Sequence, residues 1–402
     1  MDIKILDSNF KMVGIIDSYI SFIWTDRYDE AGDFELILPM DVPALDLIRT
    51  DYYLSIDNSE HIMMVGDMRV STDVESGKTM KIVGYSLEKL LDRRIIWEKT
   101  VFKQTYKDES DTVGVKPLLQ DAIIQILQDN IIYPISIDYE TGEKSFYAAR
   151  QISNFTYKKS DDAKILEKTI EAQYRGESIY EVVSSLCKEN KIGFKITLNS
   201  SNQFVFQLYR GADRTYEQDV NPYIVFSPAN DNLFNSSYYK ITSSLKNVVL
   251  VLGEQIENND PQTETEEKAN DDYKAYRAPV IVGMEAGITR REIFADASDV
   301  EIEEDDSTTL TVAQYRAHLR QRGIDTLIEN LDYEAFEGEV EATQMYKYGE
   351  DFFMGDLVQL EDEYGHEGTA YISEFIISHD TSGMNMYPTF ITIQEGEYDV
   401  DE

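Results

Sequence analysis

Trp24-Thr-Asp-Arg-Tyr-Asp-Glu-Ala-Gly-Asp-Phe-Glu-Leu-Ile-Leu-Pro39 is the stretch of this 402-residue chain that indicates its fold most clearly. Its second half, residues 33–39, alternates acidic or mixed positions with apolar ones and stops at a proline, which predicts a β-strand. Two more strands are predicted at 61–70 and 78–84, joined by a short turn. Short strands separated by turns over residues 1–100 are typical of a small barrel or a sandwich.

Two short helical segments interrupt these strands. One is predicted at 42–48, where a proline stands near the first turn. The other is predicted at 86–94, with Ser86 as the N-cap and arginines at the C-terminal end, where they complement the helix dipole. We therefore expect a strand-rich region that helices interrupt but do not dominate.

Residues 101–221 have a different character, because apolar residues recur at helical spacing. The elements predicted here are helices at 116–128 and 178–188 and strands at 192–198 and 203–209. The second helix opens with the capping-box pattern Ser178-Ile-Tyr-Glu181, and residues 199–202 separate the two strands as a hairpin turn. This region is predicted to be a helix-plus-sheet domain inserted after the first strand-rich one.

Strand character returns over residues 222–402. Strands are predicted at 222–227, 247–253, 276–283, 333–340, 356–360, 369–377 and 387–393. A long helix is predicted near 308–332, and acidic loops are predicted near 254–275 and 296–306. The predicted fold class is α+β, mainly β, with two small β-barrel domains at 1–100 and 222–402 and inserted α/β subdomains, the larger at 101–221.

The net charge of the chain is −39, and it is unevenly distributed. Residues 1–250 hold 38 acidic and 28 basic residues, whereas residues 251–402 hold 38 acidic and 9 basic ones. Such a surface repels phosphate, so a sequence-reading or groove-binding nucleic-acid protein is disfavoured, as is binding to an anionic membrane. Two interpretations of the charge stay open: it provides solubility, or it lines a passage through which an anionic polymer slides without sticking.

Cysteine usage is compatible with folding in a reducing cytoplasm, and the N-terminus does not predict a leader. The single Cys187 cannot form an intramolecular disulfide, and the helical spacing of its neighbours predicts a buried structural thiol. Charges interrupt the apolar run of residues 1–7, and no window approaches about 18 consecutive apolar residues. We therefore expect neither a signal peptide nor a membrane span.

Catalytic and cofactor motifs are absent from the sequence. It contains no phosphate-binding loop, no dinucleotide-binding glycine motif, no H-E-x-x-H zinc motif and no nucleophile elbow, and one cysteine cannot build a CxxC zinc site. The four histidines are predicted to be structural or surface residues: His61, His318, His366 and His379. We therefore assign no catalytic, cofactor-binding or metal-binding residue, and we expect no cofactor and no enzymatic activity.

Two weaker signals have ordinary structural explanations. The acidic run Glu301-Ile-Glu-Glu-Asp-Asp306 offers oxygen ligands for Ca²⁺, but it lacks the central glycine and fixed spacing of an EF-hand loop, so we interpret it as a solvated charge run. The 27 tyrosines suggest stacking on carbohydrate, yet they are dispersed through predicted strands, where tyrosine is a common half-buried residue. No pair of carboxylates stands out as a glycosidase dyad.

Several segments together resemble one known family. Residues 24–39 and Ser86-Leu-Glu-Lys-Leu-Leu-Asp-Arg-Arg-Ile-Ile-Trp97 are similar to the N-terminal signature of siphophage tail proteins from phages and prophages of Gram-positive bacteria. Support comes from residues 225–247 and from Leu319-Arg-Gln-Arg-Gly-Ile-Asp-Thr-Leu327 with Gly355-Asp-Leu-Val-Gln-Leu-Glu-Asp-Glu-Tyr-Gly365. The resemblance spans almost the whole chain, and its motifs mark a fold and not a reaction.

The resemblance implies a member of the tail-tip or baseplate hub superfamily. Such proteins carry two barrels with smaller inserted domains and assemble as homotrimers, so that a ring of six similar units matches a sixfold tail tube to a threefold tip. The implied function is structural: the ring closes the distal end of the tube, docks on the hexameric distal tail protein and forms a gated channel for the tape measure protein and DNA during ejection. An acidic lumen would repel DNA phosphates from its wall.

The resemblance also implies a location at the virion tail tip, after assembly in the host cytoplasm. Longer relatives carry a C-terminal peptidoglycan hydrolase or receptor-binding module, whereas this chain ends at Glu402. Lytic activity is therefore not carried over: either a tip fibre, receptor-binding protein or lysin is a separate partner, or a C-terminal extension has been removed. Two alternatives stay open, a receptor- or carbohydrate-binding tail-tip protein and a cell-wall hydrolase.

Overall fold

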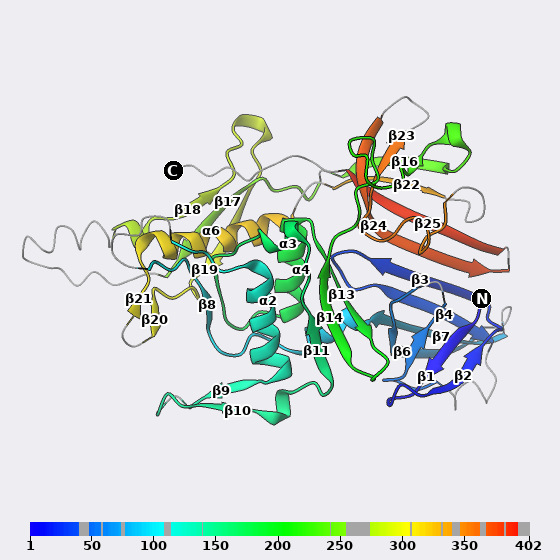
Figure 1. Cartoon of the computed structure of the whole chain (residues 1–402), viewed down its shortest axis with the longest axis horizontal. Helices are drawn as coiled ribbons and strands as arrows, with labels where there is room; N and C mark the ends of the chain where they lie inside the picture. The colour runs from blue at the N-terminus through cyan, green and yellow to red at the C-terminus, as the bar shows by residue number, and fades with distance from the viewer. Residues whose placement is uncertain are drawn as a thin grey trace, which may run out of the picture.

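The computed structural model of the chain places a large sheet on one side and the helices, with several smaller sheets, on the other (Figure 1). The structure describes residues 1–39, 48–57, 59–73, 77–107, 114–138, 140–241, 243–254, 274–305, 308–330, 333–339, 346–361, 367–381 and 383–392. Strands outnumber helices along this part of the chain. The predicted fold class, α+β and mainly β, is confirmed.

One sheet of thirteen strands is the main element of the described residues, in the order β16-β22-β25-β24-β3-β4-β7-β6-β5-β1-β2, with β23 pairing to β24 and β15 to β23. Its N-terminal strands are β1 Ile3–Leu6, β2 Met12–Ile16, β3 Ser21–Arg27, β4 Asp33–Pro39, β5 Tyr53–Ser55, β6 Met63–Asp73 and β7 Gly77–Ser86. Its C-terminal strands are β15 Val225–Phe226, β16 Phe234–Ile241, β22 Tyr333–Glu339, β23 Leu357–Glu361, β24 Glu367–Asp380 and β25 Gly383–Thr392.

The pairing of β3 with β24 joins the two ends of the chain in this sheet. The strands are antiparallel, and Arg27 lies opposite Glu374. Arg27 Nε is 2.6 Å from Glu374 Oε2, and its NH1 is 2.6 Å from Asp33 Oδ2 on β4, so one guanidinium links three adjacent strands. Cross-strand pairs of opposite charge stabilise such a register.

Alternation along β3 and β4 places one face of each strand in a shared core. Phe34, Leu36 and Leu38 of β4 are buried, as the sequence pattern predicts, and Trp24 of β3 packs against Phe34. The same core contains Phe226, Phe375 and other residues from the C-terminal strands. Residues more than 300 positions apart are thus buried together, which the sequence did not indicate.

The described strand pairings form an open path from β16 to β2. Among these residues no pairing closes either half of the sheet on itself, so the two small barrels expected from the sequence stay a prediction. The boundaries at 1–100, 101–221 and 222–402 also stay predictions.

The region after β7 folds around a second core, with apolar faces of two helices packed on small sheets. Its helical elements are η1 Leu87–Arg93, α2 Leu119–Leu127, η2 Gln128–Ile132, η3 Ala148–Arg150, α3 Ala163–Leu166 and α4 Ile179–Asn190. Its strands are β8 Thr100–Phe102, β9 Ile135–Ile137, β10 Lys144–Phe146, β11 Phe155–Lys158, β12 Ala172–Tyr174, β13 Gly193–Leu198 and β14 Phe204–Tyr209. The predicted 192–198 and 203–209 hairpin is confirmed as β13 and β14.

A third core surrounds the long predicted helix, α6 Val312–Ile328. Thr311 and Gln314 form a capping box at its start, which satisfies backbone donors that the first turn leaves open. The other elements here are β17 Val248–Gly253, β18 Val280–Val282, β19 Glu292–Ala297, β20 Glu303–Asp305, β21 Thr308–Thr309 and η5 Gly287–Thr289, while η4 Pro228–Asn230 lies between β15 and β16 of the large sheet. Gly323 of α6 lies directly against valine side chains of β17 and β18, where a larger residue would collide.

Three local predictions are wrong. Ser178 precedes α4 but makes no cap, because its hydroxyl donates to Asp92 Oδ1. Ser86 likewise does not cap the segment at 86–94, which is a 3₁₀ helix, because its hydroxyl accepts from the Gly32 amide. Residues 274–277 are helical, so the strand predicted at 276–283 is shorter, spanning Val280–Val282.

Some predictions fall outside the described residues. They include the helix at 42–48 except for its last residue, most of the acidic loop near 254–275, Asp306 at the end of the second acidic loop, and His366.

Candidate functional site

A cleft of about 890 Å³ lies where residues 57–61, 195–214 and 347–386 come together. Its lining comes from the loop before β6, from β14 and the residues after it, from the segment before β23, and from β25. Ser59, His61, Tyr209, Tyr348 and Asp356 are among the lining residues. A cavity of this size is comparable with ligand-binding clefts.

His61, which lines this cleft, belongs to a buried group of three ionisable side chains with Asp26 and Glu88. All three are almost fully inaccessible to solvent. His61 Nδ1 is 3.3 Å from Glu88 Oε1, and the same carboxylate oxygen accepts a hydrogen bond of 2.6 Å from the Ile196 amide of β13. Buried charge is tolerated only when it is paired in this way.

Asp26 is held by two donors from different elements. Trp24 Nε1 donates to Asp26 Oδ1 at 2.9 Å, and Ser59 Oγ donates to both carboxylate oxygens at 3.0 and 2.8 Å. Burial raises the pKa of Asp26 above its ordinary value, although His61 and these hydrogen bonds act in the opposite direction.

The pKa values of His61 and Glu88 shift in the directions expected of an ion pair. Burial by itself would lower the pKa of His61, but the charges of Asp26 and Glu88 outweigh burial and raise it to about 9. Burial would raise the pKa of Glu88, but the neighbouring His61 outweighs burial and lowers it. The imidazole is therefore protonated at neutral pH and serves as the internal cation for two carboxylates.

This arrangement ties elements together and supplies a fixed internal charge. Asp26 belongs to β3, His61 to the loop before β6 and Glu88 to η1, while Ile196 belongs to β13. Its geometry suits a structural ion cluster that fastens β13 to the large sheet.

Tyr28 packs at the same junction between β13 and the large sheet, where its ring lies against two glycines. A Cβ placed on Gly193 would lie 2.4 Å from the Tyr28 ring, and one placed on Gly355 would lie 2.2 Å from it. The ring therefore fits between the backbone of β13 and the backbone just before β23, where only glycine leaves room. Tyr28 comes from the stretch 24–39, so this stretch contacts both later regions of the chain.

A buried ion pair closes the other wall of the cleft. Arg214 Nε is 2.5 Å from Asp356 Oδ2, and Asp356 is almost fully buried. The Ala212 and Phe353 amides also donate to this carboxylate, at 2.6 and 3.0 Å. The pair joins the residues after β14 to the segment before β23.

The histidines considered from the sequence have separate surroundings. His61 belongs to the buried cluster, His318 Nε2 lies 3.0 Å from the Phe102 carbonyl, and His379 Nδ1 lies 2.5 Å from the Tyr19 hydroxyl. His366 lies outside the described residues. Within the described ranges, no group of three or more His, Cys, Asp or Glu side chains is placed to hold a metal ion.

Cys187 and Glu301, the first residue of the acidic run at 301–306, have structural surroundings. Cys187 is buried in α4, as predicted, and burial raises the pKa of its thiol. Glu301 pairs with Lys99 at 2.5 Å and with Arg175 at 3.3 Å, so this carboxylate is part of a salt-bridge network. No helix in the described part of the chain combines the length and apolar character needed to cross a membrane.

The sequence signal for the buried cluster is weak but identifiable. Asp26 stands two residues after Trp24, so both side chains lie on one face of β3, and an acid on an apolar strand face requires a buried partner. Apart from Trp24, its partners are 33 or more positions away, and spacing alone cannot connect them.

Solved structures of tail proteins share this fold along their whole length. The 43 kDa tail protein of prophage MuSo2 from Shewanella oneidensis is 12% identical, with a TM-score of 0.52 and 98% of each chain covered. The tail protein from Neisseria meningitidis MC58 is 11% identical, with a TM-score of 0.50, covering 98% of this chain and 97% of that one. At such low identity the likeness shows a common fold.

The family is shown by sequence. A family model described as siphovirus ReqiPepy6 Gp37-like protein matches residues 2–390, and the chain belongs to this family. The resemblance to siphophage tail proteins is thereby confirmed. None of the curated proteins matches the chain in sequence.

Proposed function

We propose that this chain is a structural tail-tip, or baseplate hub, protein of a siphophage virion. In this proposal three copies form a ring that closes the distal end of the tail tube and docks on a hexameric distal tail protein. The ring forms a gated channel for the tape measure protein and DNA. It assembles in the host cytoplasm, and each copy contributes two barrels.

The observation that carries the proposal is the thirteen-stranded sheet, in which strands from both ends of the chain meet at β3 and β24. If each of three copies presents two strand-rich halves, the ring offers six similar units to a sixfold partner. A sheet that fixes the two halves of one chain side by side supports this arrangement. The family match over residues 2–390 supports a tail role for the whole chain.

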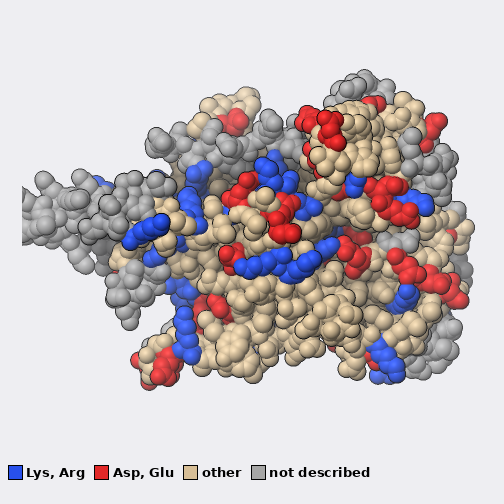
Figure 2. All heavy atoms as spheres, in the orientation of Figure 1, with Lys and Arg blue, Asp and Glu red and all other residues tan. Residues whose placement is uncertain are grey.

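The acidity supports a channel that does not retain DNA. Of the 38 acidic residues after position 250, 17 lie in segments outside the described residues. On the face drawn in Figure 2, the described acidic and basic side chains are interleaved, so this face is not the uniformly acidic wall. We expect that wall on another face, directed into the ring.

Assembly is tested by native mass spectrometry of the full chain, alone and mixed with the distal tail protein of the same phage. We expect a mass of three chains in the mixture. A chain that stays monomeric in the presence of this partner would contradict the proposal. An electron cryo-microscopy map of the assembled tip then shows whether its inner wall is negative or neutral.

We also propose that the chain has no hydrolase activity of its own. The buried carboxylates of Asp26, Glu88 and Asp356 are engaged in ion pairs and hydrogen bonds. Zymography on Gram-positive peptidoglycan should give no clearing, and a cleared band at the mass of the chain would refute this part.

A further inference from the structure

A second, smaller recess has a lining that shares no residue with that of the large cleft. It has a volume of about 150 Å³ and lies between the end of α2, the residues leading into β8, and the β9–β10 hairpin. This volume is below the range of drug-sized pockets, so it suits a single small polar unit.

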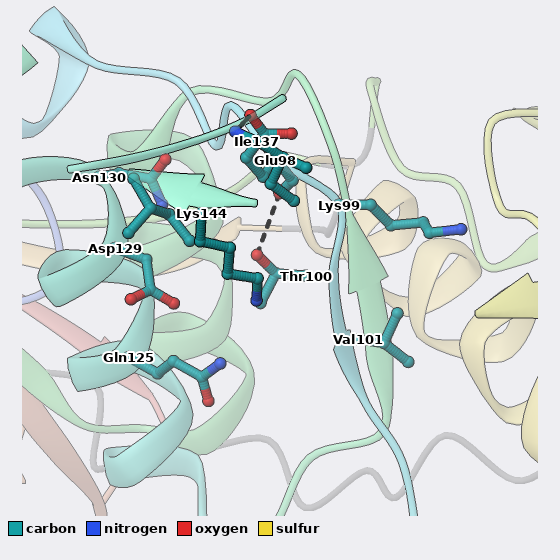
Figure 3. Close-up of a pocket in the computed structure, with 10 residues that line it drawn as sticks. Glu98, Lys99, Thr100, Val101, Gln125, Asp129, Asn130, Ile137 and Lys144 are labelled. Carbon is teal, nitrogen blue, oxygen red and sulfur yellow. Dashed lines mark hydrogen bonds between the residues drawn. The ribbon is translucent and has the colours of Figure 1, made fainter. Parts of the chain in front are cut away.

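The recess combines an apolar side with a set of accessible polar groups. Figure 3 shows the Lys144 side chain extending toward Thr100, whose hydroxyl donates to the Glu98 carbonyl, with Asp129 and Gln125 nearby, while Lys99 and Val101 point away. Gln125 hydrogen-bonds Asp129, and the nearby Lys144 lowers the pKa of this carboxyl, although burial raises it overall. A carboxylate, an amide and an ammonium thus offer both donors and acceptors around one small space.

Buried hydrogen bonds hold the wall of the recess in place. Glu98 Oε1 accepts from the Ile137 amide of β9 at 3.0 Å, which fixes the hairpin to the residues before β8. Asn130 Oδ1 accepts from the Trp97 amide at 3.0 Å and from Arg150 at 3.2 Å. A wall fixed in this way loses little freedom when it binds a ligand.

Two stacked aromatic rings stand beside the recess. Tyr133 and Phe146 have ring centroids 4.6 Å apart and an interplanar angle of 21°, and their exposed fractions are 59% and 39%. Phe146 and Lys144 are alternate residues of β10, so their side chains lie on the same face of the hairpin. Phe146 pairs with Ile135, which also lines the recess.

We propose that this recess and the Tyr133–Phe146 pair bind one uncharged sugar residue of a glycan. A sugar ring has an apolar C–H face, which stacks on an exposed aromatic ring, and hydroxyls that need both donors and acceptors. The recess offers the donors and acceptors, and the Tyr133–Phe146 pair, which includes a residue of the hairpin that contributes Lys144 to the recess, offers the apolar surface. Lys144 and Asp129 carry opposite charges, so the recess has no excess of positive charge to attract an anion. These residues therefore favour a neutral sugar over an anionic one.

Two sources can supply this chemistry, a free sugar or a polysaccharide of the host surface. In the first arm, saturation-transfer-difference NMR of the full chain is recorded with neutral hexoses and N-acetylhexosamines. In the second arm, the chain is incubated with protein-free cell-wall polysaccharide and analysed by sedimentation. We expect signal in both arms if the site reads a terminal sugar, and in the second alone if it needs a longer glycan.

Substitutions locate the binding. Tyr133→Ala and Phe146→Ala should each weaken glycan binding about tenfold, because each removes part of the stacking surface. Asp129→Asn should weaken it as well, because it removes a charged acceptor at nearly unchanged volume. Tyr216→Ala is the matched control, since Tyr216 is 55% exposed and also contacts another tyrosine, outside this recess.

Absence of signal in both arms would overturn the proposal, as would binding that Tyr133→Ala and Phe146→Ala leave unchanged. Loss of association with the distal tail protein in these variants, without any glycan signal, would identify the pair as a protein contact and refute glycan binding. The trimer mass does not depend on this site, so the hub proposal and the glycan proposal can fail separately.

Discussion

At the residue scale, the buried charge of His61 has a predictable effect on stability. The pKa of His61 is raised to about 9 from an ordinary value of 6.5. When the pKa of a histidine is higher in the folded state than in the unfolded state, its protonation contributes to the free energy of unfolding. This contribution is complete at a pH below the unfolded-state pKa, and it is lost as the pH rises through the folded-state pKa. The ion cluster should therefore weaken between about pH 6.5 and pH 9.

We expect His61→Gln to remove this pH dependence. The unmodified chain should lose up to about 3 kcal/mol of unfolding free energy between pH 6.5 and 9, since one pKa unit corresponds to about 1.4 kcal/mol. The variant should be less stable at pH 6.5 and show a flatter profile, measured by urea unfolding. His379→Gln is the control, because it also removes a histidine, but one whose ring contacts the Tyr19 hydroxyl and lies outside the Asp26–His61–Glu88 group. An equal pH slope in all three proteins would contradict the assignment.

Asp325 of α6 gives a second prediction of the same sign. Burial and the nearby Glu189 raise its pKa to about 7. An acid with a raised folded-state pKa destabilises the fold as the pH rises above its unfolded value. Gln321 Nε2 donates to both carboxylates, and Ser185 donates to Asp325 Oδ1, so an amide oxygen can retain these bonds.

We expect Asp325→Asn to stabilise the chain by about 1 kcal/mol at pH 8 and to have little effect at pH 5. Thermal unfolding at both pH values measures the difference. Ser185→Ala is a useful comparison, because it removes a hydrogen bond to the same oxygen without removing charge. Destabilisation by Asp325→Asn at pH 8 would show that the carboxylate has a favourable partner there.

At the element scale, the contact of β13 with the Tyr28 ring depends on the absence of a side chain at position 193. A Cβ at Gly193 would lie 2.4 Å from the ring and 2.7 Å from the Tyr28 carbonyl oxygen. Gly193→Ala should therefore cost about 3 kcal/mol, at the upper end of overpacking. Gly368→Ala is the control, since a Cβ on this glycine of β24 meets nothing within 4 Å. Equal unfolding midpoints for the two variants would refute the contact.

How well the sequence predicts an element depends on whether local pattern decides it. β4 was predicted at its observed bounds because each buried side chain alternates with a more exposed one. The caps at Ser86 and Ser178 were predicted wrongly because distant groups, the Gly32 amide and Asp92, compete for those hydroxyls. Local pattern contains no information about such competitors, and the same holds for the partners of Asp26.

At the scale of the whole molecule, the joining of β3 to β24 could not be predicted, because it is a pairing between segments 347 residues apart. The family resemblance predicts the order of the regions along the chain. The pairing of β3 with β24 brings strands from both ends of the chain into one sheet, and side chains of both strands are buried in the same core. The sugar recess was also missed. Its residues come from α2, β9, β10 and the segment before β8, and the tyrosines were considered only as dispersed strand residues.

The open ends of the sheet give the last prediction. β2 pairs only with β1 among the described residues, and Met12, Val13 and Ile15 on it are exposed. An unpaired apolar edge strand is suited to pairing with another chain, and lysine on such an edge opposes this pairing.

If the ring proposed above uses this edge, Ile15→Lys should abolish the trimer mass in the presence of the distal tail protein and leave the unfolding midpoint of the single chain nearly unchanged. Ile288→Lys is the control, because Ile288 is fully exposed on η5. Trimers of Ile15→Lys in undiminished amount would exclude the β2 edge from the interface.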